Sequence, residues 1–365
     1  MKATISKESI TKALSLTGGI VEKKQTLPIL SNILIEFKDN SFRLVATDLE
    51  SELTIIGKTD TCETEGTTTA SAKKLNDLCR LIPDKSNIEL NLSGDKLNIT
   101  TKNGKYSLAT LPSNEFPIFE SGDNLNSITL KSQDLKTLIN STSFAMGNQD
   151  WRHYLNGLFL KLEEGVLTAV ATDAHRLALN CVDTVSDINF SGIIPRKSVN
   201  EINRFIGDDN NDLRLAINDT SLVLNNDNLT FKSKLIDGAF PDYNQVIPTG
   251  DSSLLDVNVK DFVSSLGRVS ILSNDKNKGV KLHLVDNNMF IRSNNADNEV
   301  AEETVVSKYA GEEIEIAFNV NYIQEILNNQ TNETCNVLFF GSDKSCLILP
   351  PGGEFPKYVV MPLLL

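Results

Sequence analysis

The four residues Val-Ala-Thr-Asp occur twice in this chain, at 45–48 and at 170–173, which are 125 positions apart. Each copy ends a segment of alternating apolar residues that is interrupted by a turn, at 39–40 in the first copy and at 164–165 in the second. Alternation with a period of two around a turn predicts a β-hairpin. A weaker third copy has Ile-Arg-Ser-Asn at 291–294. The sequence therefore predicts the same hairpin three times.

Helical patterns recur at nearly the same spacing as the hairpins. The segment at 71–82 returns at 195–206 and, without its basic residues, at 318–330. Apolar residues three, four or seven positions apart in these segments predict a helix with one buried face. Each unit also opens with a predicted helix, and these helices span 6–16, 132–139 and 259–269. Recurrence of this kind indicates one structural unit used three times.

We therefore predict three domains of about 122 residues, at 1–122, 123–248 and 249–365. Each domain has an α+β pattern with two helices and two antiparallel sheets. The total length of 365 residues suits two or three domains rather than one.

The net charge of −13 is unevenly distributed. Residues 1–122 contain 15 basic and 16 acidic residues, a net charge of −1. Residues 123–248 contain 11 and 16, a net charge of −5, and residues 249–365 contain 9 and 16, a net charge of −7. The first domain is thus relatively basic and the last is acidic. Opposite biases at the two ends favour head-to-tail association of identical chains.

Composition excludes several classes of protein. No apolar run approaches the roughly 20 residues of a membrane helix, and the first ten residues lack the apolar segment of a secretory signal. The five cysteines are scattered and none forms a C-x-x-C pair, so we expect reduced thiols in a cytoplasmic protein. Neither H-E-x-x-H nor a Walker A motif is present, and we expect no metal and no cofactor.

The second Val-Ala-Thr-Asp copy runs into His175 and Arg176, which raises the question of catalysis. A hydrolase would use His175 as base and Asp173 to orient it, but no G-x-S-x-G nucleophile motif accompanies them. The alternatives are the end of a repeated hairpin and a binding site for a partner.

Two further features leave alternatives open. The cations on the repeated helices are Lys73, Lys74, Arg80, Arg196, Lys197 and Arg204. They could gather into a phosphate-binding surface, or they could be ordinary solvated side chains. The last nine residues, KYVVMPLLL, either complete a sheet or line an apolar docking site.

Several segments together resemble one known family, the beta subunits of bacterial DNA polymerase III, which are sliding clamps. They are TLPIL at 26–30, TDLE at 47–50, YLNG at 154–157, ATDAHRLA at 171–178, PRK at 195–197, SKLIDGAFPDY at 233–243 and YVVMP at 358–362. The resemblance covers the whole chain in order.

The resemblance implies half of a closed ring, in which three clamp domains per subunit and two subunits joined head to tail surround duplex DNA without reading its sequence. It implies a processivity factor without catalysis that tethers the replicative polymerase alpha subunit, the clamp-loader delta subunit, other polymerases and repair factors through a linear peptide. The rival interpretation is a repeat scaffold that binds peptides without forming a ring.

Three sets of residues carry over from the family. The DNA contacts correspond to Lys24, Lys73, Gln149, His153, Tyr154 and Lys197. The peptide cleft corresponds to Leu155, Thr172, His175, Arg176, Leu177, Pro241, Val246, Ser345, Val359, Val360, Met361, Pro362 and Leu363. The subunit interface corresponds to Lys74, Lys102, Lys105, Tyr106, Leu108, Ile271, Leu272, Glu299, Glu302 and Glu303.

Three residues depart from the family pattern at the cleft. Ala174 stands where glycine is common, Gln245 where an arginine often lies, and Leu364 where a basic residue often lies. We therefore expect a less positive rim and a shifted peptide preference.

Overall fold

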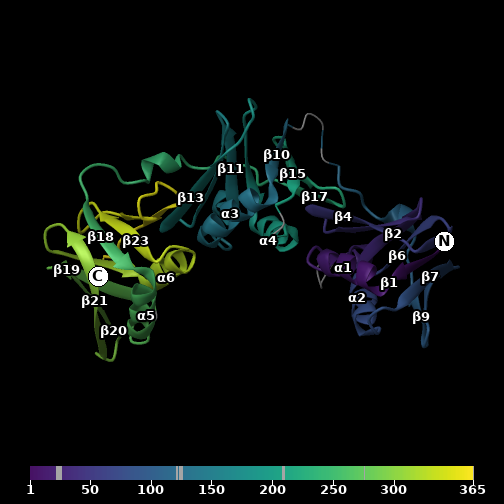
Figure 1. The fold of residues 1–365 in the computed structure, drawn as a ribbon, viewed down its shortest axis with the longest axis horizontal. Helices are drawn as coiled ribbons and strands as arrows, with labels where there is room; N and C mark the ends of the chain where they lie inside the picture. Colours follow the sequence, from purple (N-terminus) through teal and green to yellow (C-terminus); the bar gives the residue numbers. More distant parts are fainter. Residues whose placement is uncertain (22–26, 121, 123–125, 208–209, 275, 365) are drawn as a thin grey trace. The chain divides into compact units, whose positions relative to one another are not determined.

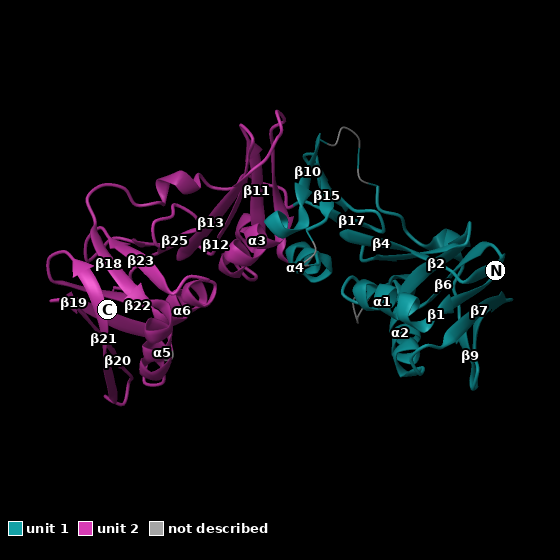
Figure 2. Cartoon of the chain, in the orientation of Figure 1, with its two compact units in different colours: residues 1–135, 197–235 teal, residues 136–196, 236–365 magenta. Residues whose placement is uncertain are grey.

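The computed structural model describes residues 1–21, 27–120, 122, 126–207, 210–274 and 276–364. These residues form two compact units, one of 1–135 with 197–235 and one of 136–196 with 236–365 (Figure 2). Each unit is described by itself below. No helix among the described residues is both long and apolar enough to cross a membrane.

The predicted pair of helices per repeat is confirmed in the described part of the chain. The helices are α1 (Lys7–Thr17), α2 (Ala72–Leu81), α3 (Ser132–Thr142), α4 (Arg196–Phe205), α5 (Val259–Ser270) and α6 (Val320–Asn328) (Figure 1). Short 3₁₀ turns are η1 (Pro28–Ser31), η2 (Ser113–Glu115), η3 (Ser143–Ala145), η4 (His153–Asn156) and η5 (Tyr243–Gln245). The side chain of Ser71 accepts a hydrogen bond from the Lys74 backbone N–H, which caps the first turn of α2.

The first unit contains two antiparallel sheets. The five-stranded sheet has the order β5 (Thr61–Thr64), β1 (Lys2–Ser6), β7 (Asn87–Ser93), β8 (Lys96–Thr101) and β9 (Gly104–Ala109). The eight-stranded sheet has the order β10 (Asn126–Lys131), β15 (Asp212–Ile217), β16 (Ser221–Asn225), β17 (Leu229–Lys234), β4 (Ser51–Lys58), β3 (Ser41–Thr47), β2 (Asn32–Lys38) and β6 (Gly66–Ser71).

The second unit is built on a twelve-stranded sheet. Its first half has the order β14 (Phe190–Pro195), β11 (Gly157–Glu163), β12 (Val166–Thr172), β13 (Arg176–Asp183), β25 (Lys357–Val360) and β24 (Cys346–Leu349). It continues through β23 (Thr334–Phe339), β18 (Ser253–Asn258), β21 (Val300–Ala310), β20 (Asn288–Asn294), β19 (Gly279–Val285) and β22 (Ile314–Asn319).

The three predicted hairpins are present as β2–β3, β11–β12 and β19–β20. Their tight turns place residues at positive φ, with Asp39 at 49° and Asn40 at 54° in the first copy. The second turn has Glu164 and Gly165 at 50° and 76°. Two successive residues at positive φ match the right-handed twist of the flanking strands, which explains why the repeat keeps polar residues and glycine there.

The sheets are not confined to one repeat, a feature on which the sequence pattern made no prediction. In the first unit β4 pairs with β17, and in the second unit β13 pairs with β25, so a sheet runs across each boundary between repeats. Pairing the edge strands satisfies backbone groups that would otherwise remain open. The compact units therefore do not coincide with the repeats. The predicted helical stripes are buried, as Leu75, Val199 and Ile323 show.

Candidate functional site

The second Val-Ala-Thr-Asp copy closes the turn between β12 and β13. The Thr172 hydroxyl donates to the Arg176 carbonyl at 2.6 Å and accepts from the Ala174 N–H at 3.1 Å. One oxygen of Asp173, Oδ1, accepts from the backbone N–H groups of His175 and Arg176, both at 3.0 Å. Ala174 adopts φ of 73°, in the region that favours glycine.

The first copy makes the same turn between β3 and β4. The Thr47 hydroxyl donates to the Ser51 carbonyl at 2.8 Å and accepts from the Leu49 N–H at 3.1 Å. Asp48 Oδ1 accepts from the N–H groups of Glu50 and Ser51 at 3.0 and 2.6 Å. The repeated Thr-Asp pair therefore stabilises a turn, which is the hairpin alternative of the sequence analysis.

The side chain of Arg176 lies at the centre of a polar network and is only 7% exposed. Its Nε donates to Asp173 Oδ2 at 3.1 Å and its Nη1 to Glu325 Oε2 at 2.7 Å. Its Nη2 donates to the Phe144 carbonyl at 2.8 Å. The guanidinium also lies 4.6 Å from the centre of the Tyr322 ring. Arg176 thus joins the second hairpin to α6 of the third repeat.

This network differs from that of a catalytic acid–base pair. Asp173 directs its carboxylate to the Arg176 guanidinium and to backbone N–H groups, and not to an imidazole. The exposed ring of His175 is nearly parallel to that of Tyr322, with centroids 6.3 Å apart. The arrangement positions a surface and does not activate a nucleophile.

The C-terminal strand completes the sheet, which was one of the two alternatives for KYVVMPLLL. In β25, Val359 lies opposite Leu177 of β13 and Leu347 of β24. Beyond the strand, Met361 N–H donates to the His175 carbonyl at 3.0 Å, and Leu363 N–H donates to the Ala317 carbonyl at 2.7 Å. Backbone bonds therefore hold the end of the chain beside the second hairpin.

An apolar cluster forms on the same strands. Its buried members are Val170, Leu177, Leu179, Leu347 and Val359. Half-buried residues pack around them, namely Phe159, Phe240, Tyr243, Val246, Ile247, Leu338, Phe340 and Leu349. We call the buried and half-buried residues together the apolar cluster. It brings together three predicted cleft residues, Leu177, Val246 and Val359.

The remaining predicted cleft residues differ in their exposure. Those that are buried are Leu155, Thr172, Arg176 and Val360; those at least partly exposed are His175, Pro241, Ser345, Met361, Pro362 and Leu363. Met361 is 38% exposed and Leu364 is 96% exposed. The chain end thus leaves apolar side chains accessible although its backbone is hydrogen-bonded.

Sequence reasoning missed an aromatic group in the cluster. The rings of Phe159 and Phe240 stack with centroids 4.7 Å apart and an interplanar angle of 4°, and Tyr243 lies 6.3 Å from Phe159. Phe159 is half-buried between the buried residues Leu158 and Leu160 of β11, so its side chain lies on the opposite face of the strand. An aromatic residue on the polar side of an alternating strand is the signal that could have revealed it.

The predicted DNA contacts fall into two groups. Gln149 and His153 are exposed and Tyr154 is half-buried, all on the loop between α3 and β11. Lys73 is exposed on α2, whereas Lys197 on α4 is half-buried. Lys24 lies outside the described residues.

The loop that carries Gln149 is fixed by its own polar groups. Asp150 N–H donates to Asn156 Oδ1 at 2.9 Å, and Asn156 Nδ2 donates back to the Asp150 carbonyl at 2.8 Å. Arg152 donates to both oxygens of the Asp150 carboxylate, at 3.0 and 2.9 Å. These bonds lower the pKa of Asp150 to about 2. The backbone of the loop is therefore preorganised.

The basic residues of α4 are engaged within the protein. Arg196 Nη1 donates to the carbonyls of Met146 and Gly147 at 2.9 and 3.1 Å. Arg204 contacts the Leu16 carbonyl and the Glu201 carboxylate. Arg196 and Arg204 of α4 thus bind groups of the protein itself.

The residues predicted for the subunit interface lie on or beside two strands, β9 and β21, and at the ends of two helices, α2 and α5. On or beside β9, Lys102, Lys105 and Tyr106 are exposed and Leu108 is half-buried, and Lys74 is exposed on α2. Ile271, which is 78% exposed, and Leu272 follow α5. Glu299, Glu302 and Glu303 lie on or beside β21. Arg268 Nη2 donates to Glu303 Oε2 at 2.5 Å. One of the three acids is therefore already paired inside its own chain.

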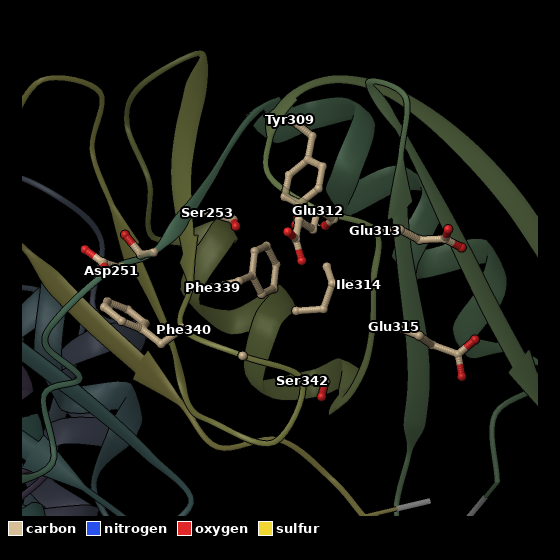
Figure 3. Close-up of a pocket in the computed structure, with 12 residues that line it drawn as sticks. Asp251, Ser253, Tyr309, Glu312, Glu313, Ile314, Glu315, Phe339, Phe340 and Ser342 are labelled. Carbon is tan, nitrogen blue, oxygen red and sulfur yellow. The ribbon is translucent and has the colours of Figure 1, made fainter.

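A hollow of about 650 Å³ lies where β18, β21, β22 and β23 meet (Figure 3). Tyr309 Oη donates to the Glu312 carbonyl at 2.7 Å on its rim. Two lining acids are already paired, Glu313 with His283 at 2.7 Å and Glu315 with Lys281 at 3.0 Å. None of its lining residues belongs to the predicted sets.

Comparison with known proteins identifies the family. Residues 1–120, 129–242 and 244–364 match the N-terminal, central and C-terminal domains of the DNA polymerase III beta subunit. The chain is 36% identical over 365 residues to the beta sliding clamp of Pseudomonas putida and 35% identical over 364 residues to that of Escherichia coli K12, with 100% of each chain covered.

Solved structures agree with this match. The DNA polymerase III subunit beta of Pseudomonas aeruginosa superposes with a TM-score of 0.97 at 35% identity, and a structure of the sliding clamp of that organism bound to griselimycin superposes with 0.98 at 35%. Both cover 100% of each chain. The chain therefore belongs to the beta-subunit family of DNA polymerase III, the DNA sliding clamps, and is a processivity factor and not an enzyme.

Proposed function

We propose that two copies of this chain close head to tail into a ring around duplex DNA and tether the replicative polymerase to it. The observation that carries this proposal is a strand pairing that recurs between successive repeats. After the first hairpin, β4 pairs with β17, with Ser51 opposite Ser233. After the second hairpin, β13 pairs with β25, with Arg176 opposite Val360. The third hairpin needs an equivalent strand from a further repeat.

The first repeat of a second copy can supply that strand. β9 follows β8 as β17 follows β16 and β25 follows β24, so β9 is the corresponding strand. It lies at the edge of its sheet, and residues 300–306 of β21 pair with β20 on one side only among the described strands. Two open edges of this kind, one at each end of the chain, favour head-to-tail pairing that closes in a ring.

The expected register follows from the hairpins. In the third repeat, Val300 of β21 occupies the place that Arg176 of β13 has in the second repeat. In the first repeat, Leu108 of β9 occupies the place that Val360 of β25 has in the third repeat. Leu108 of one copy is therefore expected opposite Val300 of the other.

The same register places Lys105 opposite Glu303 and Tyr106 opposite Glu302. Lys74, Lys102 and Glu299 lie beside this seam, with Ile271 and Leu272 as its apolar part. A basic edge against an acidic edge steers association and disfavours like-with-like contact.

We further propose that the apolar cluster and the exposed chain end bind linear peptides of polymerases, the clamp-loader delta subunit and repair factors. Half-buried aromatic and aliphatic side chains beside an accessible Met361 supply pockets for apolar anchors of a short peptide. The network around Arg176 holds the second hairpin in place under this surface. The neutral Gln245 and apolar Leu364 favour peptides whose ends carry little negative charge.

Duplex DNA is proposed to contact the exposed cations of α2 and the loop at 148–154 through phosphates, without sequence readout. We place the protein in the cytoplasm, where its five free cysteines stay reduced. One domain per repeat, with boundaries near 122 and 248, remains our domain assignment.

Topological retention tests the ring. The protein is loaded on nicked circular DNA with a clamp loader, and the DNA is then linearised. A ring stays on the circle and leaves through free ends, whereas equal retention on both forms would contradict the proposal. Light scattering is expected to give twice 40.2 kDa. A monomer that still binds polymerase peptides would support the repeat-scaffold alternative.

A further inference from the structure

Asp48 uses its two carboxylate oxygens for different purposes. Oδ1 closes the first hairpin turn through backbone N–H groups, and Oδ2 accepts from the Lys197 ammonium at 2.5 Å. The Asp48 side chain is 5% exposed and that of Lys197 is 36% exposed. Burial alone would raise the pKa of Asp48, but the Lys197 ammonium and the Ser51 N–H keep it below its ordinary value. The pair is therefore charged and largely shielded on the carboxylate side.

A matched lysine occupies the corresponding position of the first repeat. Lys73 is the second residue of α2 as Lys197 is the second residue of α4. Lys73 is exposed, and no carboxylate of the described residues lies within ion-pair distance of it. The lysine at this position is therefore paired with a carboxylate on α4 and exposed on α2.

We propose that Asp48 is a positioning residue that withholds Lys197 from DNA, so that Lys73 makes the full phosphate contact of the matched pair. This inference rests on the proposed encirclement of duplex DNA. A phosphate that approached Lys197 would have to compete with a fixed, nearly buried carboxylate, whereas one that approached Lys73 displaces only water and counterions. Fewer phosphate contacts mean fewer released counterions and weaker retention at any one position, which suits a ring that slides.

The salt dependence of binding measures this directly. Each neutralised phosphate contributes about −0.9 to the slope of log K against log salt. Asp48→Asn keeps an oxygen for the turn but removes the carboxylate charge that accepts from the Lys197 ammonium. We expect this variant to steepen the slope by about 0.9, which corresponds to roughly eightfold tighter binding for each tenfold decrease in salt.

The experiment uses the full-length protein and a fluorescently labelled duplex, with anisotropy measured over a range of KCl concentrations. The variants are Asp48→Asn, Lys197→Gln, Lys73→Gln and Asp48→Asn combined with Lys197→Gln. Lys73→Gln is expected to flatten the slope by about 0.9, and Lys197→Gln by less than half as much. The double variant is expected to lose the gain produced by Asp48→Asn.

Two results would overturn the inference: an unchanged slope for Asp48→Asn, or equal losses for Lys197→Gln and Lys73→Gln. The second comparison stands even if Asp48→Asn folds poorly. If Lys73→Gln flattens the slope while Asp48→Asn does not change it, the restraint is wrong and DNA encirclement survives. If neither lysine affects binding and the protein does not remain on circular DNA, the proposed function itself fails.

Discussion

Replacing Arg176 with alanine should destabilise the second hairpin and, through it, the pairing of β13 with β25 of the third repeat. Arg176 is 7% exposed and loses hydrogen bonds to the Asp173 carboxylate and to the Phe144 carbonyl. Hydrogen bonds to charged groups contribute about 1.5–3 kcal/mol each, so these two give about 3 kcal/mol at the low end. Glu325 is 48% exposed, and its ion pair is counted at no more than about 1 kcal/mol because solvent screens it.

Hydrogen exchange of the backbone N–H groups in β13 and β25 measures this loss. Since about 1.4 kcal/mol corresponds to a factor of ten, about 3 kcal/mol predicts roughly 100-fold lower protection in these strands. Protection in the five-stranded sheet of the other unit should not change. His175→Ala is the matched control, because its exposed ring accepts none of these bonds, and it should leave protection within a factor of three.

The same pair of variants separates structure from binding. Arg176→Ala is expected to weaken polymerase-peptide binding through the displaced hairpin, while encirclement of DNA persists. A protection factor that stays within threefold of the wild-type value in Arg176→Ala would refute the reasoning, because the buried guanidinium would then contribute little to the pairing of β13 with β25. Loss of encirclement with intact peptide affinity would also count against the assignment of this region.

Three further outcomes are expected. Lys105→Glu should weaken self-association at least tenfold by facing Glu303 with a like charge, and adding Glu303→Lys should restore part of it; sedimentation velocity checks both, and an unchanged single variant would count against the proposed register. Ala174→Gly should raise the free energy of unfolding of the second unit by about 1 kcal/mol, because φ of 73° strains alanine and not glycine; urea denaturation followed by circular dichroism checks it, and a loss of stability would show that the turn is not strained. At pH 8 an aromatic disulfide reagent should modify native protein only at its two half-buried thiols and modify all five after denaturation, because burial raises the pKa to about 12 at Cys79, Cys335 and Cys346.

Much of the fold could be predicted from local pattern. The alternation at 33–46 and the residues of positive φ at Asp39 and Asn40 specify a hairpin wherever they occur, because pleat and turn geometry are properties of a few neighbouring residues. The buried stripe of α4 is specified in the same way. Sheets that cross repeat boundaries were not predicted, because strand partners such as β13 and β25 are separated by many residues and local pattern does not select between edges.

The candidate site also contains residues that were predicted from the sequence and residues that were missed. Leu177, Val246 and Val359 were predicted together through the family resemblance, and they meet in one apolar cluster. The aromatic stack of Phe159 with Phe240 was missed, because each residue alone is an ordinary half-buried side chain. Only packing shows that they form one surface.

The sequence by itself determined that the same pattern of hairpin and helices is repeated three times, since this pattern depends on short-range geometry. Only the tertiary structure decided what the repeated cations do. Lys73 and Lys197 occupy the same position of equivalent helices, yet one is exposed and the other is held by Asp48, 149 residues away. The reason is physical: the electrostatic state of a charged side chain depends on which groups surround it in space, and the chain brings those groups together only when it folds.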